Sequence, residues 1–105
     1  MKLKATALVA GAALLSLGLV GNAAADGAAL YQSKACFTCH GADAKTPIMP
    51  VYPKLAGQNA DYAYNQMMDI KSGKRANGQS AAMKGIMAGV TEADARAIAD
   101  WLATQ

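Results

Sequence analysis

The pentapeptide Cys36-Phe37-Thr38-Cys39-His40 contains both cysteines of the 105-residue chain and its only histidine. On one helical turn, thiols at positions i and i+3 lie on the same face, so both can reach a single ligand. The imidazole of His40, one residue further on, can then reach the same ligand. A chain of this size buries only a modest core and often depends on disulfides, a metal or a cofactor for its stability. The chemistry of this segment therefore decides the fold.

The C-x-x-C-H spacing is the pattern of covalent haem c attachment, in which each thiol adds to one vinyl group and the histidine binds the iron. A thioredoxin-like redox pair would need a βαβ setting, and no β-branched runs flank the motif. A structural zinc site needs four ligands, and the motif supplies three. A disulfide remains an alternative in an exported protein, but a loop this small gains little stability and leaves His40 unexplained. We predict one haem c, with its iron, attached through Cys36 and Cys39 and ligated by His40.

The first 25 residues have the features of a secretory signal peptide. Lys2 and Lys4 give a positive start, an apolar run follows over residues 5–20, and Ala23-Ala24-Ala25 resembles a cleavage site. A retained anchor helix is the alternative, but the run is shorter than the ~20 residues that a bilayer span needs. We expect residues 1–25 to be removed and residues 26–105 to form a periplasmic domain without stable membrane insertion.

Composition limits the function classes. The whole chain is 53% hydrophobic and 16% charged, and its length suits one domain. Without the first 25 residues it has eight Lys and Arg side chains against seven Asp and Glu, so it is nearly neutral. Nucleic-acid binding is excluded because it calls for clustered cationic residues.

The sequence predicts an all-α fold with three or four helices around one cofactor. Asp26 is placed to cap a first helix that runs to the C-x-x-C-H segment. Residues 41–58 contain three prolines and no sustained period, which predicts a loop ordered by the cofactor. A second helix is expected to start at Asn59 or Asp61 and to end near Gly73.

Residues 72–80 are polar, contain glycine and predict a linker. The last helix has the clearest signal. Thr91 and Asp94 approximate a capping box, and Ile98, Trp101 and Leu102 recur at helical spacing. Its apolar face is expected to pack on the first helix.

The sixth iron ligand cannot be a second histidine, so we considered the methionines of residues 26–105. Met49 follows His40 closely and is expected on the histidine side of the ring. Met67 and Met68 lie in a helical pattern, where methionine usually fills the core. Met83 and Met87 lie in or near the connection before the last helix, which is free to cross the opposite face. We favour Met83, with Met87, water, lysine or an open position as alternatives.

Several segments together resemble the class I cytochromes c. Pro53-Lys54-Leu55-Ala56-Gly57-Gln58, then Tyr62, Gln66 and Ile70-Lys71-Ser72-Gly73-Lys74-Arg75, are similar to the pattern of the small bacterial cytochrome c-553 type and the related dihaem cytochrome c4 type. The resemblance covers residues 26–105 and implies a class I cytochrome c fold. The single C-x-x-C-H departs from the dihaem form, and Val51-Tyr52 and Trp101 also depart from the usual pattern.

The resemblance implies roles for individual residues. The iron-binding methionine of the pattern precedes the cap of the last helix by eight positions, which again selects Met83. A proline carbonyl, Pro50 or alternatively Pro47, is implied as the acceptor of the His40 Nδ1 proton. Arg75 is implied as the partner of a haem propionate, with a solvated loop arginine as the alternative.

Two further residues match the pattern at a helix crossing. Gly27 corresponds to the small residue where the first and last helices cross, and Trp101 corresponds to its aromatic partner. Trp101 as an ordinary core residue amounts to nearly the same prediction.

The resulting functional expectation is a periplasmic monohaem electron carrier, not an enzyme, because an iron closed by two protein ligands favours electron transfer over oxygen chemistry. It is expected to be a monomer that docks transiently on redox partner proteins. Four lysines are candidates for steering an acidic partner, although scattered lysines are usually solvated: Lys34, Lys45, Lys54 and Lys84. The alternatives are a haem subunit of a larger periplasmic oxidoreductase and a haem-based ligand sensor with an open or displaceable sixth position.

Overall fold

The computed structural model describes residues 23–105, and residues 1–22 of the predicted signal peptide, which spans residues 1–25, lie outside this range. The described residues form five α-helices and no strand: α2 (Ala23–Ser33), α3 (Phe37–His40), α4 (Ala60–Ser72), α5 (Ser80–Met87) and α6 (Glu92–Ala103). The predicted all-α class is therefore confirmed. No helix among these residues is long and apolar enough to cross a membrane.

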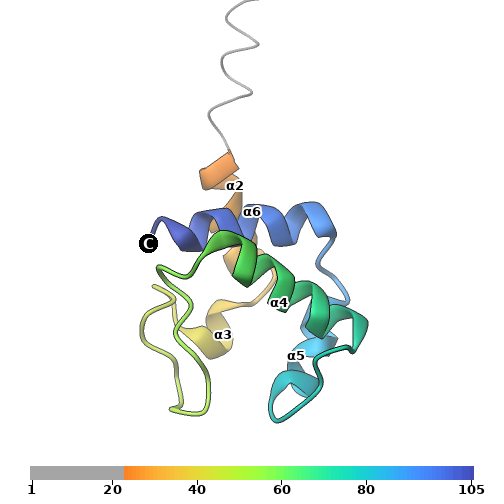
Figure 1. The fold of residues 1–105 in the computed structure, drawn as a ribbon. Coiled ribbons are helices and arrows are strands. Elements are labelled where there is room, and N and C mark those ends of the chain that lie inside the picture. Colours follow the sequence, from red (N-terminus) through yellow and green to blue (C-terminus); the bar gives the residue numbers. More distant parts are fainter. Residues whose placement is uncertain (1–22) are drawn as a thin grey trace, which may run out of the picture.

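Helix α6 is the centre of the fold, with α2 crossing one side of it and α4 packed on another (Figure 1). The crossing of α2 and α6 is close because Gly27 has no side chain. A Cβ atom there would lie 2.5 Å from the Cβ of Trp101 and would also collide with the carbonyl oxygen of Ala97. Trp101 packs against Tyr31 with ring centroids 5.0 Å apart. The predicted roles of Gly27 and Trp101 at this crossing are confirmed.

The start of α6 is the predicted capping box. The Thr91 hydroxyl accepts a hydrogen bond from the backbone N–H of Asp94, and the Asp94 carboxylate accepts one from the backbone N–H of Thr91, both at 3.1 Å. This reciprocal pair satisfies two N–H groups that the first turn of a helix leaves without partners. Helix α4 also ends as predicted, at Gly73, which adopts the left-handed conformation with φ 85°.

Two predictions about helix bounds were wrong. Asp26 does not cap the first helix, because α2 already includes Ala23 and places Asp26 in its first turn. That helix does not run unbroken into the C-x-x-C-H segment either, since a turn at residues 34–36 separates it from α3. Ala35 has a positive φ of 63° in this turn, which reorients the chain before Cys36.

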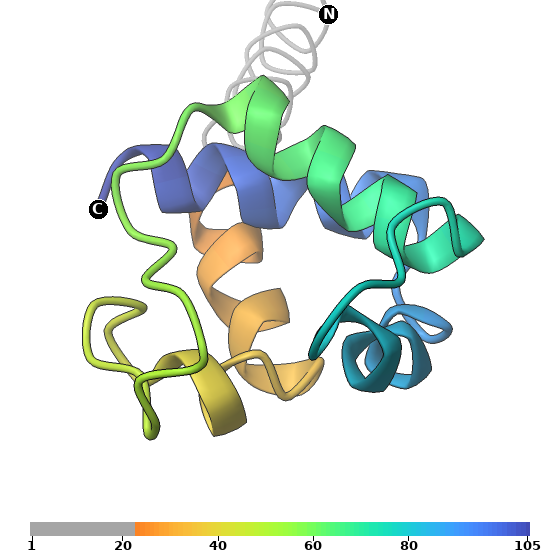
Figure 2. The ribbon, with the colours of Figure 1, turned by 60° about the horizontal axis from the view of Figure 1, so that its bottom comes forward.

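A third difference concerns the segment before the last helix. Residues 80–87, which include Met83, form the helix α5 rather than a loop. Helices α3 and α5 lie on opposite sides of the space below α4 and α6 (Figure 2).

Candidate functional site

A cavity of about 550 Å³ lies between α3 and α5, and residues of α4 and α6 also line it. This volume falls within the range of small-molecule and cofactor sites. Cys36, Cys39 and His40 all line it, together with Met83 and Arg75. The structure thus brings these five predicted site residues together around one space.

The cavity wall on the α3 side carries the three residues of the motif. Both thiols are free and half-buried. Burial raises the pKa of the Cys36 thiol to about 11, so the neutral thiol predominates at neutral pH. His40 is 7% exposed.

The orientation of His40 is fixed by a backbone carbonyl, but not by the predicted one. Its Nδ1 lies 2.8 Å from the carbonyl oxygen of Pro53, so both Pro50 and Pro47 were wrong. The ring edge of Tyr52 packs on the imidazole, with centroids 6.5 Å apart. With Nδ1 held by Pro53, Nε2 is the ring nitrogen available to an iron.

The loop after α3 can return beneath His40 because Gly41 turns the chain. Gly41 has φ 90°, and a Cβ atom on it would collide with the carbonyl oxygen of Thr46. The backbone N–H of Ile48 then donates to the carbonyl oxygen of Cys39 at 3.2 Å. This path carries residues 49–53 along the cavity, where Val51, Tyr52 and Pro53 line it.

Tyr31 is a site residue that the sequence did not single out. Its side chain is fully buried, it lines the cavity, and its hydroxyl donates to the carbonyl oxygen of Gly41. Burial is the main reason that the pKa of Tyr31 is raised to about 12, with the charges of Cys36 and Asp43 adding to it. No pattern in the sequence distinguishes this tyrosine from other first-helix core residues.

The methionines differ in their surroundings. Met83 and Met87 both line the cavity, but Met83 is half-buried, whereas Met87, one turn later on α5, is 2% exposed and belongs to the hydrophobic core. Met67 also lines the cavity from within the core. Met49 is 50% exposed and lies outside the cavity lining, and Met68 packs against the core.

Arg75 is oriented by its neighbours. Its guanidinium donates to Gln66 Oε1 at 2.9 Å, and its backbone N–H donates to the carbonyl oxygen of Asp69 at 3.0 Å. Gln66 also lines the cavity, so the cationic group is held at its wall.

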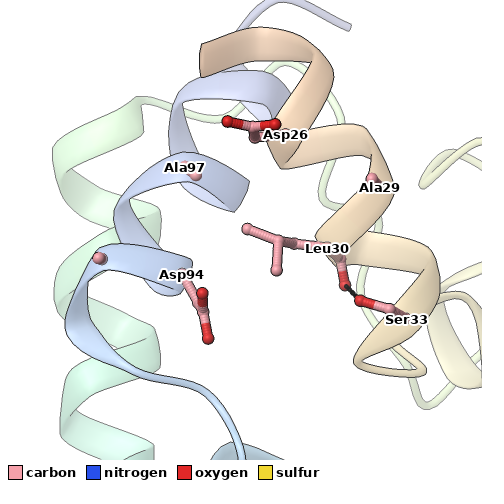
Figure 3. A pocket seen from close by; sticks show the side chains of 7 residues that line it. Asp26, Ala29, Leu30, Ser33, Asp94 and Ala97 are labelled. Carbon is pink, nitrogen blue, oxygen red and sulfur yellow. Dashed lines mark hydrogen bonds between the residues drawn. The ribbon is translucent and has the colours of Figure 1, made fainter. Parts of the chain in front are cut away.

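A second hollow lies on another part of the molecule, between α2 and α6. Leu30 projects into it from α2, and the carboxylates of Asp26 and Asp94 border it (Figure 3). It contains neither cysteine nor His40. Within residues 23–105, no three His, Cys, Asp or Glu side chains are grouped so that they could hold a metal ion by themselves.

Comparison with known proteins identifies the family of this chain. The family described as Cytochrome c matches residues 24–105. The chain belongs to the cytochrome c family. Cytochrome c4 of Pseudomonas aeruginosa is 46% identical over 95 residues, which cover 88% of this chain and 45% of that protein. Cytochrome c-553 of Nitratidesulfovibrio vulgaris is 33% identical over 90 residues, covering 86% of each chain.

The chain thus spans less than half the length of that cytochrome c4 and most of the length of the cytochrome c-553. A protein of Stutzerimonas stutzeri named thiosulfate dehydrogenase electron acceptor is 41% identical over 76 residues, covering 66% of this chain and 35% of that protein. The resemblance to small class I cytochromes c is confirmed, and with it the class I fold. This cytochrome c is an electron-transfer protein of the haem c type, with iron in its cofactor.

Proposed function

We propose that this cytochrome c is a periplasmic monohaem carrier that passes single electrons between redox partner proteins. Haem c supplies the redox-active iron when it is bound. Cys36 and Cys39 would hold it through thioethers, and His40 and Met83 would bind its iron. The observation that carries the proposal is the single cavity that all four side chains line.

The chain's own residues have distinct tasks in this proposal. The Pro53 carbonyl keeps the proton on Nδ1 of His40, so that Nε2 faces the iron in a fixed orientation. Arg75, held by Gln66, neutralises a haem propionate. The apolar walls exclude water and disfavour the extra positive charge of the ferric state, which raises the reduction potential.

The choice of Met83 over Met87 rests on burial. Met87 is already packed in the core at 2% exposure, so turning its sulfur toward an iron would open a void. Met83 is half-buried at the cavity wall and can supply its sulfur without such a loss. A thioether ligand also closes the iron, which suits a carrier better than a ligand sensor.

The test is the absorption spectrum of the purified protein in both oxidation states. We expect a low-spin c-type spectrum, a weak near-infrared band from sulfur bound to ferric iron, and no change with carbon monoxide. Met83→Ala is expected to abolish that band and to lower the reduction potential. Met87→Ala, the matched control, is expected to retain the band. Loss of the band in Met87→Ala alone would transfer the ligand role to Met87, and a wild-type spectrum that responds to carbon monoxide would favour a sensor.

Transient docking distinguishes a free carrier from a subunit of a larger oxidoreductase. We expect the purified chain to be monomeric and to exchange electrons rapidly with soluble partners. Size-exclusion chromatography and stopped-flow reduction measure both. A stable complex with a catalytic chain would support the subunit role instead.

A further inference from the structure

Helices α4 and α5 are joined at one end by a lysine. Lys71, in the last turn of α4, donates a hydrogen bond from Nζ to the carbonyl oxygen of Met87 at 2.9 Å. The same Nζ lies 3.4 Å from the carbonyl oxygen of Ala88. Met87 is the last residue of α5 and Ala88 is its C-cap. Carbonyl groups at a helix C-terminus have no partner within the helix and carry partial negative charge. A lysine ammonium group there both donates a hydrogen bond and places a positive charge near the negative end of the helix dipole.

Apart from the burial of Ser80 and Met87 at its two ends, helix α5 is weakly held by its own sequence. It has eight residues, far fewer than the ~12–15 that an isolated helix needs in water. Its N-cap, Gln79, makes no side-chain capping hydrogen bond. Gly85 lies in its interior and has no atom within 4 Å of where a Cβ would stand. The position of α5 therefore depends on its contacts with neighbouring elements, of which α4 is the main helical one.

A second lysine crosses the same interface in the opposite direction. Lys84 of α5 reaches the C-cap of α4, where its Nζ lies 2.9 Å from the position that a Cβ on Gly73 would occupy. Lys71 is the lysine of this pair that donates hydrogen bonds to the end of α5.

We infer that Lys71 is a positioning residue that holds α5, and with it the Met83 sulfur, at the cofactor cavity. Met83 lies one helical turn before Met87, so a contact that fixes the Met87 carbonyl also fixes the turn that carries Met83. The Met87 carbonyl also accepts from the backbone N–H of Val90 at 3.0 Å. Without the ammonium group it keeps this local bond but loses its link to α4, so the helix moves away from the cavity more often. This inference rests on the proposed ligation by Met83.

The experiment measures how readily imidazole displaces the sulfur from the ferric protein. Imidazole binds the iron only when the sixth position is open, so its apparent affinity reports the open fraction. Lys71→Met keeps the length and apolar stem of the side chain but removes the donor. We expect it to raise the imidazole affinity about three- to tenfold, the range that follows from losing a partly exposed charged hydrogen bond. Displacement of the sulfur is followed during the imidazole titration by the loss of the near-infrared band from sulfur bound to ferric iron.

Lys74→Met is the matched control. Lys74 lies three residues after Lys71, just beyond the end of α4, and is exposed; its side chain makes no hydrogen bond or ion pair among residues 26–105. The substitution removes the same charge, so we expect imidazole affinity to stay within twofold of wild type. Lys71→Arg keeps a cationic donor and is expected to lie nearer to wild type than Lys71→Met.

Three results would overturn the inference. If Lys71→Met and Lys74→Met raise the imidazole affinity equally, the loss of one positive charge explains the change and the Lys71 contact does not. A lower guanidinium unfolding midpoint in Lys71→Met with unchanged imidazole affinity would show a purely structural role. A wild-type protein without the sulfur band would remove the Met83 ligation as well, which separates failure of the proposed function from failure of the Lys71 contact alone.

Discussion

The hydroxyl of Tyr31 donates a hydrogen bond of 2.5 Å to the carbonyl oxygen of Gly41, ten residues later and directly after His40. This bond connects the last turn of α2 to the end of the C-x-x-C-H segment. Because Tyr31 also packs on Trp101 of α6, one side chain links the helix crossing to the wall that carries His40.

Replacing Tyr31 by phenylalanine should remove one of the two donors to the Gly41 carbonyl, which also accepts from the backbone N–H of Ala44 at 3.1 Å. We expect Tyr31→Phe to lower the free energy of unfolding by about 0.5–1.5 kcal/mol, the usual net contribution of one hydrogen bond. Guanidinium unfolding followed by circular dichroism measures it. Tyr62→Phe is the control, because Tyr62 is 53% exposed, and an equal loss in both variants would contradict the role of the Gly41 bond.

Tyr31 also predicts a pH dependence. Its folded-state pKa of about 12 is higher than the ordinary value of 10.0, so its contribution to stability is complete below pH 10 and is lost as the pH rises toward 12. Unfolding curves between pH 9 and 12 should show this fall in the wild type and a weaker fall in Tyr31→Phe. Identical profiles would exclude Tyr31 as the group responsible.

Removing both thiols tests how far the fold depends on its cofactor. Most of residues 41–59 have no regular structure, and a cavity of about 550 Å³ would collapse or fill with water without haem. We expect Cys36→Ala with Cys39→Ala to contain no covalent haem and to be largely unfolded by circular dichroism. Either single variant should retain one thioether and intermediate stability. A stable, folded double variant would contradict a haem-dependent fold.

The crossing of α2 and α6 should tolerate no side chain at Gly27. We expect Gly27→Ala to cost about 1–3 kcal/mol, because the new methyl group meets backbone atoms that cannot move aside without shifting a helix. Gly85→Ala is the opposite case, since a Cβ there has open space in a helix, and it should stabilise the protein by about 0.5–1 kcal/mol. Thermal unfolding of both variants measures the contrast, and a neutral Gly27→Ala would rule out the close crossing.

The contribution of the α6 capping box to stability should be measurable both by mutation and by changing the pH. Thr91→Ala is expected to lower stability by about 1 kcal/mol, as for other N-cap residues. Hydrogen bonding to Thr91 keeps the pKa of Asp94 below its ordinary value, so its contribution is present above about pH 4 and is lost as the pH falls through the lowered pKa. Acid unfolding of the wild type and of Asp94→Asn would test this, and a Thr91→Ala variant as stable as wild type would disprove the cap.

Several features could be predicted from the sequence because they depend on residues close together in the chain. The haem motif is five residues long, the Thr91–Asp94 box spans four, and Gly73 ends α4 through its own backbone freedom. Helix α5 was missed because it is short and weakly capped, and it forms through packing on α4. The carbonyl that holds His40 was assigned wrongly because every proline in the loop offers the same acceptor.

The all-α class, the attachment motif, the N-cap of α6 and the glycine that ends α4 follow from the sequence alone, since local chemistry and periodicity specify them. The folded chain alone reveals that Pro53 orients His40, that Tyr31 supports Gly41, and that Lys71 reaches the end of α5. Each of these contacts joins residues ten or more positions apart. Which of many equivalent carbonyl groups receives a donor depends on the path of the folded chain, and that path is set by packing around the cofactor cavity.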